Sequence, residues 1–405
     1  MKLAIVTAYP PSKVTLNEYA YHLVKQFRQK ETVTELILLT DKTEGKKDLE
    51  FTEAGCKITV KECWEFNSYT NIINVTKAIN ATKPDSVLFN LQFMKFGDKK
   101  IAAALGLMLP LVCKLKRIPS IVLLHNILEE VDLGSAGFTQ NKIMQKLYGF
   151  IGTTLTKLIL QADTVAVTIE KYVDVLEKKY NAKNIKLIPH GTFEIPEEPD
   201  YIVPTEPMQI MTFGKFGTYK KVEGMIEAVE IVRASTGLNL EVVIAGTDNP
   251  NVPGYLAKVQ EDYKHVPQIR FTGYVEEHEV PTLFNESTVV VFPYTSTTGS
   301  SGVLHQAGSY GKAVVMPDLG DLAHLVKDEG YRGEFFEPTS VESLAKAIEN
   351  IVTNDTYRIE LGKANYKAAT ALPMSKIADM YLETFNAISQ QKNLSKAAKT
   401  ESLMA

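Results

Sequence analysis

The sequence predicts an α/β protein made of two doubly wound domains, each a parallel sheet covered by helices on both faces. Short apolar segments alternate with longer amphipathic ones, which is the pattern of strands and helices in a parallel sheet. The alternation stops once, over residues 192–207, and then starts again. A chain of 405 residues is long enough for two domains of ordinary size.

The first domain is predicted over residues 1–195. Strands are expected at short apolar runs, and helices where apolar residues recur every three or four positions. The predicted strands are Leu3–Ala8, Leu36–Thr40, Val87–Phe89, Ile121–His125, Thr164–Ile169 and Ile185–Ile188. The predicted helices are Asn17–Lys30, Asn71–Asn80, Lys100–Lys116, Lys142–Gln161 and Lys171–Tyr180.

A connector is predicted between the domains because residues 192–207 are rich in proline and acid. Proline fixes φ and donates no N–H, so this segment should be a stiff, solvated chain. The residues concerned are Pro196, Pro199, Pro204, Pro207, Glu194, Glu197, Glu198, Asp200 and Glu206.

The second domain is predicted over residues 208–371. Its predicted strands are Ile210–Phe213, Glu241–Ala245, Arg270–Thr272, Val289–Phe292 and Val314–Met316. Its predicted helices are Lys221–Ser235, Gly254–Lys264, Val280–Asn285, Gly302–Ser309, Val341–Thr353 and Asp355–Ala369. A last helix within residues 372–391 could cap either domain, including the first, and a polar tail should fray after it.

Composition excludes several classes of protein. The net charge of −4 does not favour nucleic acid as a partner. Three cysteines without metal-ligand spacing indicate a reducing, cytoplasmic compartment. The apolar segment Ile101–Cys113 is too short to span a bilayer, so it is predicted to be a buried helix. The alternative is an interfacial helix that touches the inner face of a membrane.

The strongest local signal follows the predicted strand Val289–Phe292. Residues 293–307 carry small hydroxyl side chains and two glycines that run directly into a predicted helix. Glycine lets a ligand approach the backbone, and the first N–H groups of a helix attract an anion because they lack partners within it. This loop is a candidate site for a pyrophosphate and for sugar hydroxyls. The alternative is an ordinary joint with a serine N-cap.

A second loop, residues 214–221, follows the predicted strand Ile210–Phe213 of the same sheet. It contains Lys215, Lys220 and Lys221, and lysine is a point charge suited to phosphate. The cluster could neutralise a leaving diphosphate, or it could be a solvated basic loop. Ligands of doubly wound sheets bind at the carboxyl ends of the strands, so the two loops are expected to act together.

Several common motifs are missing from the sequence. There is no Asp-x-Asp, no Gly-x-Gly-x-x-Gly after the first strand and no Walker-type Gly-x-x-x-x-Gly-Lys. Their absence argues against a metal-dependent transferase, a dehydrogenase and an NTPase, so no metal and no cofactor are expected. Among the histidines, His125 ends a predicted strand and should face the site, whereas His190 could be functional or structural.

The second half resembles the family-4 glycosyltransferases through an ordered series of motifs. These are Phe213-Gly214-Lys215 with Lys220, Val243-Ile244-Ala245-Gly246, Arg270-Phe271-Thr272-Gly273-Tyr274, Val291-Phe292-Pro293, Gly302 to Gln306-Ala307, and Gly311-Lys312-Ala313-Val314-Val315. The first half is similar through Ala8-Tyr9-Pro10-Pro11, Leu124-His125 and Ile188-Pro189-His190-Gly191. The resemblance covers about residues 1–370 and implies the GT-B fold, in which two Rossmann-like domains face each other across a cleft.

The resemblance also implies roles for individual residues. Lys215, Lys220 and His125 would act in catalysis: the two lysines would grip the diphosphate, and His125 would contact the donor sugar from the first domain. The other residues expected to bind the donor are Gly214, Tyr274, Thr298, Gly299, Ser300, Ser301, Gly302, Val303, Leu304 and Gln306. Tyr274 would border the base, and Leu304 and Gln306 would lie near the ribose.

One departure from the family concerns Thr298 and Gln306. The family usually has two glutamates at these positions, and here both side chains are neutral. Glutamine can still hydrogen-bond ribose hydroxyls. A subset of the family shares the stretch Thr298–His305, so the departure is interpreted as a variant.

The resemblance implies transfer of a hexose from a nucleotide-diphosphate sugar, with retention of configuration and without a metal. UDP and glucose are expected from family frequency. The acceptor would be a glycan or a lipid-linked precursor in polysaccharide or glycoconjugate synthesis, shaped by the loops Phe93–Asp98 and Leu128–Gly137. Two alternatives stay open: a nucleotide-sugar epimerase of GT-B fold, and a non-catalytic protein that binds nucleotide sugar.

Overall fold

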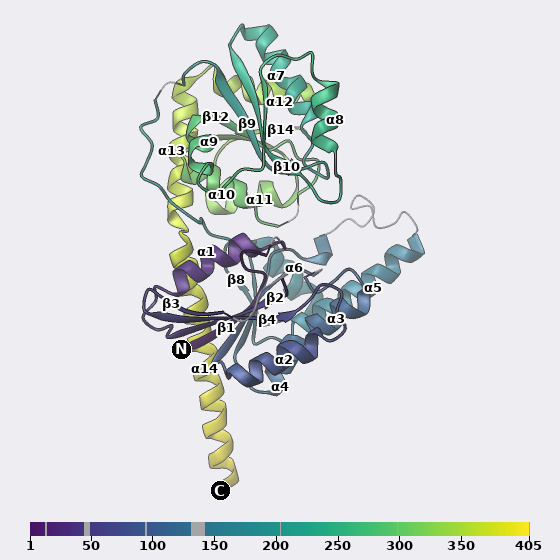
Figure 1. Cartoon of the computed structure of the whole chain (residues 1–405), viewed down its shortest axis with the longest axis vertical. Coiled ribbons are helices and arrows are strands. Elements are labelled where there is room, and N and C mark those ends of the chain that lie inside the picture. The colour runs from purple at the N-terminus through teal and green to yellow at the C-terminus, as the bar shows by residue number, and fades with distance from the viewer. Residues whose placement is uncertain are drawn as a thin grey trace. The chain divides into compact units, whose positions relative to one another are not determined.

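The computed structural model describes residues 1–12, 14–43, 49–93, 95–130, 142–202, 204–297 and 299–404. The chain forms two compact units (Figure 1). The first unit contains Met1–Pro189 and Met374–Ala405, and the second contains His190–Pro373. The proline-rich connector therefore belongs to the second unit, although the sequence pattern placed it between two domains.

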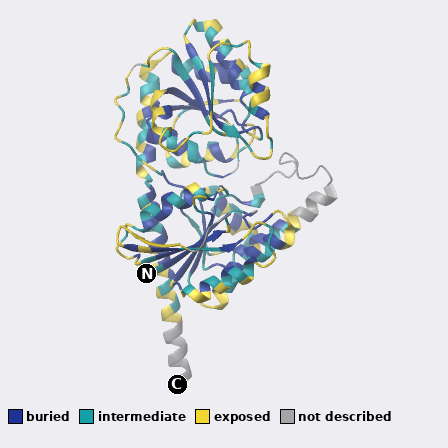
Figure 2. Ribbon diagram, in the orientation of Figure 1, coloured by how far each residue is buried: buried dark blue, intermediate teal, exposed yellow. Residues whose placement is uncertain are grey.

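The first unit is built around an eight-stranded sheet in the order β3-β4-β2-β1-β5-β6-β7-β8. All neighbours are parallel except β3, which pairs antiparallel with β4. The strands β1, β2, β5 and β6 are almost wholly buried because helices cover both faces of the sheet (Figure 2). The strands are β1 Lys2–Val6, β2 Glu35–Asp41, β3 Leu49–Glu53, β4 Cys56–Trp64, β5 Ser86–Leu91, β6 Ser120–Leu124, β7 Thr164–Val167 and β8 Ile185–Leu187.

The helices of the first unit include one from the far end of the sequence. They are α1 Asn17–Phe27, α2 Asn71–Thr82, α3 Lys100–Leu107, α4 Leu109–Leu115, η1 Leu128–Glu130, α5 Lys142–Ile159, α6 Glu170–Tyr180 and α14 Met374–Met404. Helix α14 packs against α1, where the Tyr381 and Phe27 rings meet at 6.3 Å. Lys30 Nζ binds Asp379 at 2.7 Å, so the end of the chain is fastened to the first unit.

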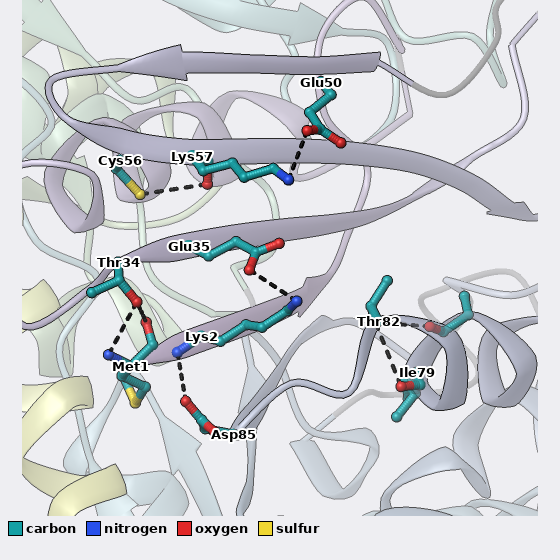
Figure 3. A network of polar contacts seen from close by, with 11 residues as sticks. Met1, Lys2, Thr34, Glu35, Glu50, Cys56, Lys57, Ile79, Thr82 and Asp85 are labelled. Carbon is teal, nitrogen blue, oxygen red and sulfur yellow. Dashed lines mark hydrogen bonds and ion pairs between the residues drawn. The ribbon is translucent and has the colours of Figure 1, made fainter.

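Ion pairs link neighbouring strands of the first sheet (Figure 3). Lys2 Nζ on β1 lies 2.9 Å from Glu35 on β2, and Lys57 Nζ on β4 lies 2.6 Å from Glu50 on β3. Such half-exposed pairs contribute about 0–1 kcal/mol each. The register therefore rests mainly on the buried faces of the strands.

The second unit has a six-stranded, fully parallel sheet in the order β11-β10-β9-β12-β13-β14. Its strands are β9 Met208–Phe216, β10 Leu240–Asp248, β11 Ile269–Gly273, β12 Ser287–Val291, β13 Ala313–Pro317 and β14 Glu334–Phe336. Its helices are α7 Glu223–Thr236, α8 Tyr255–Asp262, α9 Val280–Glu286, α10 Gly302–Ser309, α11 Gly320–Glu329, α12 Val341–Val352 and α13 Asp355–Ala371. Helices α7 and α12 pack together over a core that includes Ile226, Val229 and Ile348.

The structure adds elements that the sequence pattern did not predict and alters others. β3, β4, α11 and β14 were not predicted. The predicted helix Lys100–Lys116 is two helices, α3 and α4, with Pro110 in the first turn of α4. The tail predicted to fray after residue 391 continues α14 to Met404.

The order of strands in each sheet reverses beside its first strand. In the second unit the chain runs outward from β9 through β10 and β11, and then returns to place β12 on the other side of β9. In the first unit β2 and β5 flank β1 in the same way. Ligands of doubly wound sheets bind at the carboxyl ends of the strands at this switch point. In the second unit those ends are the two loops singled out in the sequence.

Within the described residues, no helix has the length and apolar character needed to cross a membrane. The segment Ile101–Cys113 is mostly packed into the first unit, with Ala102, Leu107 and Cys113 buried and Ile101 exposed. Cys56, Cys63 and Cys113 are buried free thiols.

Candidate functional site

The lysine loop, residues 214–221, continues directly from β9. Gly214 has φ 138°, a left-handed conformation that favours glycine. A Cβ atom at this position would lie 2.5 Å from Lys220 Nζ. Gly217 N donates to Lys220 O at 3.0 Å, so the chain turns back and brings Lys220 to the end of its own strand.

Lys220 is the central cation of the second unit. Its side chain is only 9% exposed, and its Nζ lies 3.4 Å from Phe213 O and 4.8 Å from the centre of the Tyr294 ring. Within the described residues it forms no ion pair with an acidic side chain. Burial lowers its pKa, while carbonyl and ring contacts support the ammonium. A buried cation without an anion next to it is suited to an anionic ligand.

The other two lysines of the loop point elsewhere. Lys215 is exposed at the end of β9. Lys221 Nζ lies 4.9 Å from the centre of the Tyr255 ring, on the side of α8. The Lys221 backbone N donates to Pro293 O at 3.1 Å, but of the three ammonium groups only that of Lys220 lies against the loop that follows β12.

The serine loop, residues 293–301, joins β12 to α10. Tyr294 forms a bridge with Lys220, and Thr295 N donates to Tyr219 O at 2.8 Å. The Tyr294 hydroxyl is buried and bonded to the Ser301 side chain. Ser301 also caps α10 by accepting a bond from Leu304 N. Lys220 is thus linked through Tyr294 to the N-terminus of α10.

The serine loop is also held from α11. Asp321, which is buried in the first turn of α11, accepts a hydrogen bond from Gly299 N at 3.0 Å. Thr297 Oγ1 donates to Leu319 O at 3.0 Å. These bonds fix the backbone of the loop that would have to meet a ligand. Asp321 therefore supplies a carboxylate to this loop. Thr298 and Gln306, at which the resemblance leads us to expect glutamates, are neutral.

Two buried histidines support the start of α10. The rings of His190 and His305 stack with centroids 5.0 Å apart. His305 Nε2 lies 3.3 Å from Ser300 Oγ, and its Nδ1 lies 2.8 Å from Tyr331 Oη. A Cβ atom on Gly302 would lie 3.6 Å from the His190 ring. The serine loop therefore rests on an imidazole pair that is itself buried.

Burial keeps this pair of histidines uncharged. It lowers the pKa of His190 to about 4, and it lowers the pKa of His305 further below its usual value with help from His190. Glu329 Oε2 lies 3.5 Å from His305 Nδ1, and burial raises the pKa of Glu329 to about 8. Both members of the His305–Glu329 contact are therefore neutral near pH 7.

The lowered pKa of His190 predicts a loss of stability in acid. An unfolded histidine binds a proton near pH 6.5, whereas folded His190 does so only near pH 4, so the free energy of unfolding should fall as the pH drops through this window. Between pH 7 and pH 4.5 the free energy of unfolding of the wild type should fall by about 2–3 kcal/mol more than that of His190→Phe. Urea unfolding of both proteins at the two pH values measures it. Both proteins contain Glu329, so its titration cancels in the comparison. A difference in the free energy of unfolding that does not change with pH would contradict the lowered pKa of His190.

His125 lies in the first unit, directly after β6. Its Nε2 is 2.7 Å from Asn90 Oδ1, and its ring meets Tyr19 edge to face at 4.6 Å. Asn90 Nδ2 in turn donates to Thr7 Oγ1 at 3.0 Å, beside the switch point of the first sheet. The contact of His125 with a donor sugar stays a prediction.

The remaining predicted residues occupy different environments. Tyr274 follows the edge strand β11 and is 71% exposed. Gln306 and Val303 are half-buried on α10, whereas the Leu304 side chain is fully buried and its N–H serves the Ser301 cap. Thr298, Met94 and residues 131–137 of the expected acceptor loops lie outside the described residues.

Three residues of the site were missed as contributors to it: Asp321, His305 and Tyr331. Asp321 lies 22 positions after Gly299, and the helix that carries it was not predicted. Its signal was present, because Leu322, Leu325 and Val326 have helical spacing. His305 ends the stretch Thr298–His305, and the sequence predicted no role for its side chain. Nothing in the local sequence could connect it with Tyr331.

Comparisons with known proteins agree with this architecture. Residues 196–368 match the family model of glycosyl transferases group 1. Sucrose-phosphate synthase from Thermosynechococcus elongatus superposes with a TM-score of 0.69 at 16% identity, covering 96% of this chain and 100% of that one. The chain has the GT-B fold. Together, the family match and the fold support a glycosyltransferase.

Two further GT-B structures are similar over almost the whole chain. HepE of Anabaena, solved in complex with UDP-glucose, has a TM-score of 0.65 at 14% identity and covers 96% of this chain and 100% of its own. WaaG, a glycosyltransferase involved in lipopolysaccharide biosynthesis, has a TM-score of 0.63 at 13% identity, with coverage of 94% and 98%. At these identities the similarity concerns the fold. No curated protein sequence matches the chain.

Proposed function

We propose that this GT-B protein transfers a hexose from a UDP-sugar to a glycan or a lipid-linked acceptor, with retention of configuration. The observation that carries the proposal is Lys220, a buried cation without an acidic partner in the described structure, linked through Tyr294 to the serine loop. A diphosphate placed there would meet the ammonium and the N-terminal amides of α10 together.

The second unit has the kinds of chemical group that sugar transfer requires. In the transfer, the bond from the anomeric carbon to the leaving phosphate breaks and a bond to the acceptor oxygen forms. The acceptor's proton passes to the leaving diphosphate, so no protein carboxylate has to act as the base. Lys220, Lys215 and the amides of Ser300–Gly302 would stabilise the charge that develops on the diphosphate. The exposed Tyr274 is available to stack on the base.

The wider assignments rest on the same proposal. Hexose donor, UDP and retention come from the resemblance to family-4 enzymes, and HepE has been solved with UDP-glucose. A role for His125 at the sugar and a role in polysaccharide or glycoconjugate synthesis belong to the proposal as well. So does a cytoplasmic location, with peripheral contact at a membrane.

A screen of nucleotide sugars tests the proposal. The melting temperature should rise with one nucleotide sugar above the others, because a ligand at about 100 times its Kd stabilises the folded state by about 2.7 kcal/mol. Incubation of that donor with acceptor extracts should then release the nucleotide and label a glycan or lipid. If no nucleotide sugar raises the melting temperature, the proposal fails.

The same assay separates the alternatives. An epimerase would convert the donor into a second nucleotide sugar without any acceptor, which chromatography of the donor alone reveals. A binding protein without catalytic activity would show the thermal shift and release no nucleotide on long incubation. Either result would replace transfer as the activity while leaving the donor site in place.

A further inference from the structure

Two aromatic side chains of the first unit are exposed on the loop that joins β4 to α2. Phe66 is 50% exposed and Tyr69 is 53% exposed. Within the described residues, neither ring stacks on another ring or on a cation. One exposed ring is ordinary on a protein surface, but two on one short loop are not explained by the packing of the fold.

The loop that carries the two rings is clamped by a buried asparagine. Asn71, in the first turn of α2, is fully buried. Its Oδ1 accepts a hydrogen bond from Glu65 N at 3.0 Å, and its Nδ2 donates to Glu65 O at 2.7 Å. At the other end of the loop, Thr70 N donates to Ser68 Oγ at 3.3 Å. The backbone on either side of the rings is therefore fixed.

Asn67, which lies between the two aromatic residues, fastens this loop to the loop that joins β5 to α3. Its backbone N donates to Phe96 O at 2.9 Å, and its Nδ2 donates to Asp98 Oδ1 at 2.8 Å. Its Oδ1 accepts from Lys99 N at 3.0 Å. A Cβ atom on Gly97 would lie 2.3 Å from Asn67 Oδ1, so only glycine allows this close approach. The two loops thus form one rigid surface.

This rigid surface has the position and the preorganisation of a ligand site. The two loops follow β4 and β5 at the carboxyl edge of the first sheet, and doubly wound sheets bind ligands outside that edge. Aromatic side chains on a rigid loop bind with a small loss of conformational entropy. We call this surface the aromatic platform; it consists of Phe66, Asn67, Ser68, Tyr69 and Asp98.

The side chains around the rings indicate the chemistry of the ligand. Asn67 and Ser68 separate the two rings along the loop, and the exposed side chains of Glu65, Asp98 and Lys99 surround them. A protein interface needs a continuous core depleted of charge, which this arrangement does not provide. Charges of both signs likewise give no preference for an anionic partner.

A sugar ring has the complementary arrangement. One face of a pyranose carries mainly C–H groups, its rim carries hydroxyls, and it is about as large as one aromatic ring. The C–H face can pack on Phe66 or Tyr69, because the negative face of an aromatic ring attracts polarised C–H groups. The hydroxyls can bond polar groups beside the rings, such as the exposed Asp98 carboxylate, of which Oδ1 is bonded to Asn67.

We infer that the aromatic platform binds a neutral glycan chain by stacking of its sugar rings on Phe66 and Tyr69. The platform belongs wholly to the first unit and shares no residue with the lysine or serine loops. Its binding requires neither a nucleotide sugar nor turnover. The inference therefore goes beyond the proposed transfer and does not rest on it.

Affinity electrophoresis of the full chain tests the inference. The probes are native gels that contain dextran, laminarin, hydroxyethyl cellulose, xylan or mannan, with serum albumin as the reference protein. The wild type should be retarded in at least one of these gels. Phe66→Ala together with Tyr69→Ala should raise the dissociation constant for that polysaccharide by about tenfold or more, because both stacking surfaces are lost. Tyr69→Phe keeps the ring and should change it by less than about threefold.

Two double variants serve as controls. Phe51→Ala with Phe335→Ala removes two exposed rings elsewhere and should leave the retardation unchanged. Ile73→Ala with Ile101→Ala removes exposed aliphatic side chains from the first turns of α2 and α3, next to the platform. It should change the dissociation constant by less than about twofold, because aliphatic side chains do not stack on sugars. Every variant should keep the melting temperature within about 2 °C, since the replaced side chains are exposed.

Three results would overturn the inference. The first is that none of the gels retards the wild type. The second is that the variant without Phe66 and Tyr69 is retarded as strongly as the wild type. The third is that either control variant loses as much binding as the aromatic variant, which for the isoleucines would indicate a lipid or protein partner. A protein that is retarded but transfers no sugar would contradict the proposed function and leave this inference in place.

Discussion

Replacing Lys220 by methionine is expected to lower the rate of sugar transfer by about 10²–10³-fold, because a preorganised charge in a buried site is lost from the developing diphosphate. The substitution keeps an unbranched side chain, one atom shorter, that can still pack against Tyr294. Transfer is measured as nucleotide released with the donor and acceptor found in the screen. The thermal shift given by that donor should shrink in the same variant.

The control for this prediction is Lys221→Met in the same loop. The Lys221 ammonium lies over the Tyr255 ring, and the backbone bond from Lys221 N to Pro293 O is kept in the variant. Loss of this side-chain charge should therefore change transfer less than about threefold. Stability offers a second readout. A buried ammonium without an acidic partner is costly, so Lys220→Met should be at least as stable as the wild type. Near wild-type transfer by Lys220→Met would remove this residue from the diphosphate site.

His305→Phe should raise the KM for the donor about tenfold while kcat changes less, because His305 acts only by holding Ser300 in place. Phenylalanine preserves the stack on His190 but cannot bond Ser300 or Tyr331. Loss of the two hydrogen bonds of the buried imidazole costs about 1–3 kcal/mol, which denaturant unfolding measures. His305 is therefore a positioning residue.

His324→Phe provides the matched control. His324 is exposed on α11, so the same replacement there should change stability by less than about 0.5 kcal/mol and leave KM unchanged. If His305→Phe lowers stability but leaves the KM for the donor unchanged, the buried histidine supports the fold and does not shape the donor loop.

Much of the fold could be predicted because the inner strands of both sheets are continuous apolar runs. β1, β2 and β5 are buried on both faces, and for this reason most of their residues are apolar. The missed strands of the first sheet lie at its edge or next to it: β3 is exposed throughout, and β4, between β3 and β2, mixes charged and apolar residues because it is less buried. The break between α3 and α4 likewise depends on packing, since nothing before Pro110 marks it.

The site divides in a similar way. The lysine and serine loops were visible because glycine, lysine and serine gather where strands end, and their meeting followed from strand order. The resemblance assigned the diphosphate to Lys215 and Lys220 and left Lys221 out, but the sequence did not distinguish Lys215 from Lys220. The turn at Gly217 sends Lys220 inward and leaves Lys215 exposed.

The sequence by itself determined two doubly wound domains, two loops of the second domain suited to phosphate, and a resemblance to glycosyltransferases. These are properties of neighbouring residues, which local periodicity and turn chemistry record. Only the tertiary structure decided that Asp321, His305 and Tyr331 hold the serine loop and that α14 returns to the first unit. Each of these joins residues far apart in the chain, and contacts of that kind are fixed by packing.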